Sequence, residues 1–456
     1  MRSRHRPRQG YRPGLPVILL ASFLAVLWLA GGASRAEVLG QVLVRGAAWS
    51  LLVVAALFGP RPQLRGAGAI PYLILAAVVL VALQLVPLPP AIWEALPGRA
   101  VFLQAVEGAQ PWRPWSIVPG ATWNALGSLV VPVAVLLFTA GLSEQERRWL
   151  PAMILALVTA STLLGLLQFS GVRFNNPLIN EGVGAVNGTF ANRNHFALFL
   201  TLGCILVPVW AFQGSRRPMR RIPIALGLLL LFILLILASG SRAGLGLGVF
   251  AVALGLGIVW ADMRRLLQGS PRWALPAIVA GILAIVVMFV LVSVAAGRAE
   301  SITRVLSVDP SADMRSRALP TIMAMIRTYF PLGSGFGGFD PIFRLHEPFD
   351  LLKLTYFNHA HNDFLEITLE GGLAGVALLL CALLWWLKLS LRAVRHGDRL
   401  QRLGAGMLLL VIVASGFDYP ARTPLIMAVC IIAAWWLNGA ATHRNPPALP
   451  TDEQQL

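Results

Sequence analysis

The chain is poor in charged residues and in cysteine. Only 12% of its 456 residues are Asp, Glu, Lys or Arg, whereas 57% are hydrophobic. This balance excludes an ordinary soluble protein, since soluble domains carry about 25% charged residues. Cys204, Cys381 and Cys430 all fall inside apolar runs, so neither a disulfide framework nor a thiolate metal site is expected.

Sequence motifs for several common chemistries are also missing. The sequence contains no HExxH motif, no nucleophile elbow and no evident cluster of carboxylates in the outward loops. Gly333 to Gly338 formally fits GxGxxG, but this segment follows a predicted helix and not a strand. We interpret these glycines as a tight backbone turn. The formal charge of +17 includes no basic patch in a soluble domain, so we expect no nucleic-acid partner.

Apolar runs of about twenty residues recur along the chain, each long enough to cross a bilayer as a helix. We count twelve, near residues 14–33, 42–59, 69–87, 122–142, 149–170, 194–212, 222–239, 243–260, 274–297, 364–387, 403–417 and 423–440. The first run lacks a convincing cleavage site, so we interpret it as a retained helix. The sequence therefore predicts an all-α polytopic membrane protein of about twelve transmembrane helices.

Basic residues indicate which way the chain crosses the membrane. They gather in alternate short loops: Arg61/Arg65, Arg147/Arg148, Arg216/Arg217/Arg220/Arg221, Arg264/Arg265/Arg272 and Lys388/Arg392/Arg395/Arg399/Arg402. A cytoplasmic N-terminus places all of these loops in the cytoplasm, as the positive-inside rule requires. Both termini are then cytoplasmic, and the large hydrophilic loop 298–363, before the tenth helix, faces outward.

The outward loop contains a predicted amphipathic helix from Ser311 to Tyr329. Its apolar positions recur at helical spacing: Met314, Ala318, Ile322, Met325 and Ile326. Arg315 and Arg317 either form its wet face or bind an anion. Arg242 lies in a turn between two apolar runs, where an arginine is costly unless it snorkels to head groups or meets an anion.

The most informative stretch is Asn358–Asp363, which contains two histidines just before the tenth span. Asp363 and Glu366 resemble a capping box with Asp363 as N-cap. The positive end of the helix dipole would keep His361 neutral and able to accept a proton. His359 would point the opposite way in an extended run, so we expect one histidine to face the substrate and the other to be structural.

Five motifs occur in an order that resembles a known family. They are Asn187–Ala197 (NGTFANRNHFA), Ser241–Gly244 (SRAG), Arg315 ahead of Met325–Arg327, Pro331–Gly337 (PLGSGFG), and His359–Glu366 (HAHNDFLE) with Glu370–Gly372. Together they resemble the O-antigen ligase and polysaccharide polymerase superfamily of bacterial envelope enzymes. The resemblance covers roughly residues 187–375. Leu319 stands where the family often has tryptophan, which leaves the choice between Arg315 and Arg317 open.

The resemblance implies a GT-C-like, metal-independent, inverting glycosyltransferase without a cofactor. Its donor would be a glycan on polyprenyl (undecaprenyl) diphosphate, and the loop would be periplasmic, at the bacterial inner membrane. By this resemblance Arg242 and Arg315 hold the diphosphate, and His361 is the general base. The expected substrate-binding residues are Asn192, Arg193, His195, Arg317, His359 and Asn362.

The sequence leaves the acceptor and one different function class open. The acceptor is lipid A core, another glycan or a protein, in O-antigen, lipopolysaccharide or exopolysaccharide assembly. The alternative is a lipid-linked glycan flippase or secondary transporter, which also has about twelve spans. Few charges inside the spans and no evident broken helices disfavour this alternative. We expect three segments: N-terminal helices 1–186, a ligase-related core 187–375, and C-terminal helices 376–456.

Overall fold

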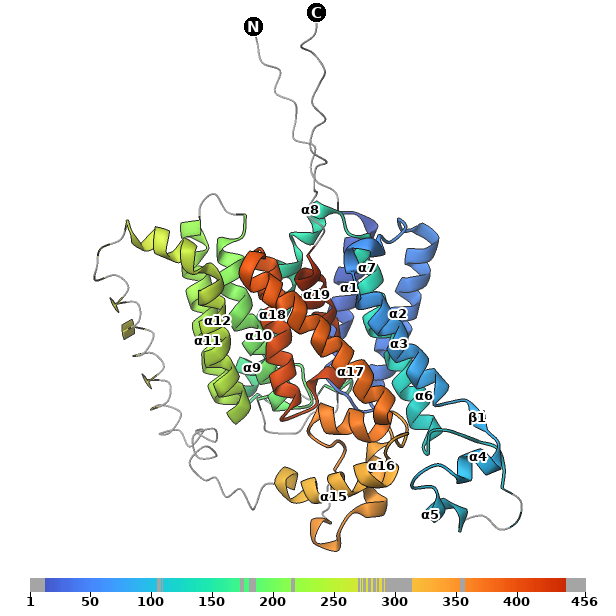
Figure 1. Ribbon diagram of the computed structural model, residues 1–456. Coiled ribbons are helices and arrows are strands. Elements are labelled where there is room, and N and C mark those ends of the chain that lie inside the picture. Colours follow the sequence, from blue (N-terminus) through green and yellow to red (C-terminus); the bar gives the residue numbers. More distant parts are fainter. Residues whose placement is uncertain are drawn as a thin grey trace, which may run out of the picture.

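The fold is known from a computed structural model of the chain (Figure 1). It describes residues 13–104, 108, 110–172, 176–179, 186–214, 218–269, 314–352 and 357–439, with scattered residues between 271 and 291. The expected outward loop 298–363 is thus described from residue 314 onward, apart from 353–356.

The described chain is almost entirely helical. Its first half contains α1 (Leu15–Ala30), α2 (Leu39–Phe58), η1 (Leu64–Ala67), α3 (Ile70–Leu83), α4 (Pro90–Glu94), α5 (Ala100–Leu103), α6 (Pro119–Ser128), α7 (Val130–Gly141), α8 (Glu144–Arg147), α9 (Leu150–Phe169) and α10 (Arg193–Phe212). Its second half contains η2 (Pro218–Arg220), α11 (Ile222–Ser239), α12 (Arg242–Leu267), α15 (Met314–Tyr329), α16 (Phe339–His346), η4 (Phe349–Leu351), α17 (Asp363–His396), α18 (Arg399–Ser415), η5 (Pro420–Arg422) and α19 (Pro424–Asn438). Strands β1 (Pro87–Leu88) and β2 (Arg113–Pro114) pair antiparallel.

The predicted all-α polytopic membrane fold is confirmed. Among the described residues, seven helical segments are long and apolar enough to cross a membrane, and α1, α3 and α19 are shorter apolar helices. Every predicted span except 274–297 coincides with a described helix. Run 274–297 falls largely outside the described residues, so the count of twelve stays a prediction.

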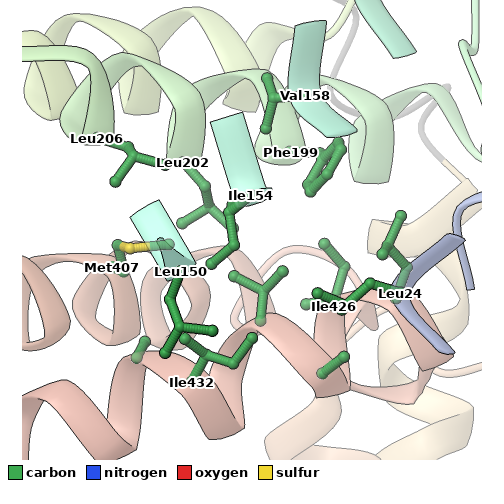
Figure 2. Close-up of a cluster of buried hydrophobic side chains, with 14 of the residues drawn as sticks. Leu24, Leu150, Ile154, Val158, Phe199, Leu202, Leu206, Met407, Ile426 and Ile432 are labelled. Atoms are coloured by element: carbon green, nitrogen blue, oxygen red, sulfur yellow. The ribbon is translucent and has the colours of Figure 1, made fainter. Parts of the chain in front are cut away.

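α10 forms the centre of the bundle. Its side chains Phe199, Leu202 and Leu206 lie in a buried cluster with Leu24 of α1, Leu150 and Ile154 of α9, Met407 of α18, and Ile426 and Ile432 of α19 (Figure 2). A helix that is apolar on all sides is stable only when neighbouring helices surround it. The dense packing fixes the position of the N-terminus of α10, where Asn192 is the N-cap.

A second, smaller core holds α15 and α16. The predicted amphipathic helix is confirmed for the described part of the loop, because Ala318, Ile322 and Met325 are buried on one face of α15. Residues 311–313, at the predicted start of this helix, lie outside the described residues. This face packs against Phe339 and Phe343 of α16, which places α15 close to the start of α17.

The predicted glycine turn at 331–337 is also confirmed, and it rests on α17. Gly333 has φ +81° and Gly372, inside α17, has φ +56°, a left-handed conformation that favours glycine. A Cβ at Gly372 would clash with the carbonyl oxygen of Pro331. α17 is therefore interrupted at Gly372 by close backbone contact with the turn.

Arg99 connects the segment between β1 and β2 to the glycine turn 331–337 by hydrogen bonds. Although only 1% exposed, its guanidinium donates to the carbonyl oxygens of Trp115 (2.7 Å) and Gly333 (3.4 Å). Burial lowers the pKa of Arg99 to about 10. Arg99 thereby joins the segment that carries α4 and α5 to the turn 331–337, at the end of the bundle where α17 begins (Figure 1).

Candidate active site

Residues 357–362, here called the histidine loop, lead into α17, which begins one residue earlier than predicted. Asn362 is the N-cap, since its Oδ1 accepts from the backbone N–H of Leu365 at 3.1 Å. The predicted capping box with Asp363 as N-cap is therefore wrong. Glu366 instead accepts from the N–H of Ala360 at 2.8 Å. Asn and Asp cap helices about equally well, so the local sequence did not decide between them.

His361 has a strained backbone, with φ +50°. This left-handed conformation is uncommon for any residue other than glycine. It is held in place because Asn362, the next residue, donates from Nδ2 to the carbonyl oxygen of Gly416 at 2.9 Å. Strain of this kind is retained where the surroundings fix it, often at functional sites.

Asp418 is the partner of His361. It lies between α18 and η5, and its Oδ1 accepts from Nδ1 of His361 at 3.1 Å. Its Oδ2 accepts from Nδ2 of Asn192 at 3.2 Å and from Nδ2 of Asn194 at 2.7 Å. The N-terminus of α10 and the histidine loop, far apart in sequence, therefore meet on one buried carboxylate.

Two further groups enclose the Asp418 carboxylate. His195 is 2% exposed; its Nε2 lies 3.8 Å from Oδ1 of Asp418, and its Nδ1 contacts Oγ1 of Thr423 at 3.0 Å. The ring of Tyr419 lies 5.0 Å from the rings of both His195 and His361, centroid to centroid. His195 and His361 thus both lie close to the same oxygen of the carboxylate, Oδ1.

The surroundings keep Asp418 ionised. Burial acts to raise the pKa of its carboxyl, but the hydrogen bond from His361 and the nearby charges of His195 and His361 outweigh burial. The pKa of Asp418 is therefore held well below its usual range. Burial also raises the pKa of Tyr419 to about 12, so the phenol beside the carboxylate stays neutral. With Nδ1 donating to a carboxylate, neutral His361 has its lone pair on Nε2.

Of the two loop arginines, Arg315 faces the Asp418 site. Its Nη1 donates to the carbonyl oxygen of Phe417 at 2.9 Å, and its Nη2 lies 3.5 Å from Oδ2 of Asp418. Arg317 points elsewhere, donating from Nη2 to Oδ2 of Asp350 at 2.9 Å. Arg315 remains 37% exposed, so part of its guanidinium faces solvent.

Arg242 and Arg193 both stand at helix starts on this end of the bundle. Arg242 is the first residue of α12 and is exposed, with no hydrogen bond or ion pair to any residue in the described ranges. Its neighbours Ala243 and Gly244 line a small cleft together with Asn194 and Arg315. Arg193 opens α10 and is half-buried. Arg242 is thus a cation at the edge of the cleft that reaches Asp418.

Three carboxylates on α17 surround Arg422. Its Nε lies 3.3 Å from Oδ1 of Asp363, its Nη1 3.2 Å from Oε1 of Glu366, and its Nη2 3.1 Å from Oε2 of Glu370. These three side chains recur at helical spacing on one face of α17. Arg422 therefore fixes the loop 416–422 against the start of α17.

His359 belongs to the carboxylate cluster. Its Nδ1 donates to Oε1 of Glu366 at 2.7 Å, and its Nε2 lies 3.2 Å from Oγ of Ser34. Both ring nitrogens are thus engaged, and the ring centroid lies 4.0 Å from that of Tyr419, with the two rings tilted by 38°. His361, by contrast, has no described partner on Nε2. The expected division between one structural and one substrate-facing histidine stays a prediction.

Two hollows flank the histidine loop and share no lining residue. One is the small cleft beside Asp418 and Arg315. The other is a cavity of about 560 Å³ lined by His359, Arg422 and residues of α2, α3, α6 and α17. No described group of three or more His, Cys, Asp or Glu side chains is arranged to hold a metal ion.

The sequence did not lead us to predict three residues of the site, Asp418, Tyr419 and Arg422. The one available signal was the short loop between the last two predicted spans, which the topology places on the outward side. A short loop carrying Asp, Tyr and Arg on the side of His361 is a candidate contributor to the site.

Residues 226–380 match the family model described as O-Antigen ligase. The resemblance to the O-antigen ligase superfamily is confirmed. The matched segment contains Arg242, Arg315, His359 and His361, whereas Asp418 follows it. No curated protein matches the chain. The family match and the apolar helices together indicate a multi-pass membrane protein for glycan transfer of the O-antigen ligase or polymerase type.

Proposed function

We propose that this protein transfers a glycan from undecaprenyl diphosphate to an acceptor hydroxyl at the periplasmic face of the inner membrane. The observation that carries the proposal is the shared carboxylate of Asp418, which contacts both His361 and Arg315. The candidate base, His361, and the candidate diphosphate ligand, Arg315, are thereby held close together by one carboxylate. Glycosyl transfer requires both groups close to the anomeric carbon.

His361 is the proposed general base. Its Nδ1 is fixed on Asp418, so Nε2 accepts the proton of the acceptor hydroxyl as that oxygen attacks the anomeric carbon. The bond between this carbon and the diphosphate oxygen breaks, and polyprenyl diphosphate leaves from the opposite face. The product therefore has inverted anomeric configuration. Asp418 stabilises the imidazolium that forms.

Arg315 and Arg242 are the proposed ligands of the leaving diphosphate. Guanidinium groups bind phosphate oxygens in a bidentate fork, and they stabilise charge that grows on the leaving group. Arg315 faces the small cleft, and Arg242 stands at its edge. Asn192 and His195 position Asp418 instead of meeting the substrate directly. Arg193, the first residue of α10, is a further proposed residue of the donor side, and the resemblance of its motif to the family supports this proposal.

We also propose that the reaction needs no metal ion. Three carboxylates on α17, those of Asp363, Glu366 and Glu370, are engaged by Arg422, and Asp418 is engaged by His361 and Arg315. The negative charge of the α17 carboxylates is thus balanced within the protein. In this proposal Arg315 and Arg242 supply the positive charge that a metal ion supplies in metal-dependent enzymes.

The proposed orientation has both termini in the cytoplasm. α10, α12, α17 and α19 begin at the end of the bundle that carries α15 and α16 (Figure 1). The basic helix ends and loops, including Arg147, Arg264 and Arg399, lie at the other end. The positive-inside rule then makes that end cytoplasmic.

A flippase or secondary transporter is the second candidate function. The interruption of α17 at Gly372 is the kind of broken helix that such proteins use. Here, however, the turn 331–337 packs against the break, and Gly372 does not line the cavity. The Asp418, His361 and Arg315 contacts have no evident role in transport, so transfer is the better supported function.

The deciding experiment is glycan transfer by the purified chain in detergent. A defined polyprenyl-diphosphate glycan serves as donor, and lipid A core, a second lipid-linked glycan or an acceptor protein is offered separately. Transfer to one acceptor should survive exhaustive EDTA treatment. Loss of transfer that a divalent metal restores contradicts metal independence, and failure with all three acceptors contradicts the proposed function.

A further inference from the structure

The cavity beside His359 has both polar and apolar lining. Ser34, Asn124 and His359 are among its polar lining residues. The apolar lining includes side chains of two helices, Leu73, Ile74 and Ala77 from α3 and Leu378, Leu379 and Ala382 from α17. Its volume of about 560 Å³ is within the range of ligand sites. An amphiphile with a lipid chain fits this pattern better than a free sugar.

Arg45 is a cation that lines this cavity and has no described carboxylate partner. It lies six residues into α2, about 9 Å along the helix from its outward end. A charge at that depth is costly without a partner. Its Nη2 donates to Oδ1 of Asn124 at 2.6 Å, while its buried Nε has no hydrogen-bond partner in the described part of the chain.

The acidic side chains around the cavity do not neutralise Arg45. Asp340 pairs with Arg344 at 2.8 Å, and Asp363 pairs with Arg422 at 3.3 Å. Glu37 also lines the cavity, but it is exposed. An anionic group of a ligand is therefore the natural partner for Arg45.

We propose that this cavity binds the acyl chains of a lipid-anchored acceptor, with a phosphate of that lipid at Arg45. The inference rests on the proposed function and names its acceptor class. The cavity reaches the histidine loop at Asn358 and His359, whereas the cleft with Arg315 is a separate hollow. Acceptor and donor therefore approach the site by different routes, as inversion requires of attacking and leaving groups.

Two pairs of variants test the site. Leu379→Trp fills the cavity, and its control is Leu380→Trp, because Leu380 is the next residue of α17 but is exposed at 52% and does not line the cavity. Arg45→Gln removes the cation, and its control is Arg65→Gln on an exposed residue of η1. Each purified chain is assayed with lipid A core and with the same core oligosaccharide freed from its lipid.

We expect Leu379→Trp and Arg45→Gln to raise KM for lipid A core by about tenfold or more. The rate of transfer to the freed oligosaccharide and the affinity for the donor should each change by less than about twofold. Ordinary surface substitutions have effects of this size. Both controls should behave as the original chain. This pattern is specific to an acceptor-lipid site.

Three results would overturn the inference. An equal loss with both acceptors indicates general damage, lower donor affinity indicates that the cavity holds the donor chain, and an unchanged KM indicates bulk lipid or no ligand. Direct binding of lipid A core is measured in parallel. If the original chain binds it and Leu379→Trp does not, the site stands even where transfer fails, and only the proposed function is contradicted.

Discussion

The carboxylate of Asp418 accepts a hydrogen bond from Nδ1 of His361 at 3.1 Å across a sequence separation of 57 residues. The contact fixes which nitrogen of His361 carries the proton, and therefore which one is available as a base. Asp418 also touches Arg315 and Asn192, so a single side chain orients groups from three parts of the chain.

Asp418→Asn should lower kcat by about 10² to 10³-fold, within the range of general-base contributions. The amide can donate to Nδ1 and leave the proton on Nε2, which removes the base. Asp350→Asn, at an exposed position, is the control and should leave kcat unchanged. Near-normal kcat in Asp418→Asn would show that His361 does not act through this contact.

His361→Ala should abolish transfer while donor affinity stays within about twofold, because a general base acts only in the transition state. His359→Ala should reduce turnover less and lower the melting temperature more, since it removes the contacts to Glu366 and Ser34. Turnover and donor binding measured on both variants separate the two roles. If His361→Ala turns over normally, His359 or His195 becomes the candidate base.

Arg315→Lys should weaken donor binding about tenfold and also lower turnover, because lysine keeps the charge but loses the bidentate fork. Arg242→Lys should act in the same direction. Arg317→Lys is the matched control from the same helix, since Arg317 pairs with the exposed Asp350. Equal losses in Arg315→Lys and Arg317→Lys would place the diphosphate elsewhere.

Arg422→Met should destabilise the fold by about 3–5 kcal/mol, because it leaves buried carboxylates without their counter-charge. Adding Glu366→Gln and Glu370→Gln should restore part of that loss. Arg344→Met, which breaks an exposed pair with Asp340, should cost less than about 1 kcal/mol. Unfolding in detergent gives the comparison, and similar losses for the two arginines would contradict the buried cluster.

Cysteine labelling tests the orientation in a chain whose three native cysteines are replaced by serine. Cysteines at positions 110 and 345 should react with an impermeant reagent added outside, whereas cysteines at 218 and 397 should not. The reason is that the first two lie at the end of the bundle that carries His361. Reversed labelling would place the histidine in the cytoplasm and contradict the proposed reaction.

Most helices were predictable because a bilayer demands long apolar runs whose backbone bonds are satisfied internally. The buried face of α15 was predictable for a related reason, since Ala318, Ile322 and Met325 recur at helical spacing. In both cases the pattern lies within a single element. A single sequence suffices to read such local patterns.

The pairing of elements was not predictable. Nothing near His361 indicates that its partner is Asp418, because this contact depends on how α18 packs against α17. Asp363, Glu366 and Glu370 did share a recognisable helical face, yet the cation that neutralises them, Arg422, lies more than fifty positions later. Ion pairs between residues far apart in the sequence could therefore be identified only from the structure.

The arrangement around Asp418 limits how this enzyme can be divided or recombined. A chimaera that inserts residues 226–380 into a relative would import His361, Glu366 and Glu370 but take the opposing acid and guanidinium from the host. Unless the host supplies matching groups in the loop before its last helix, the graft would carry an unoriented imidazole and uncompensated acids. Swaps should therefore keep residues 187–439 together as one exchange unit.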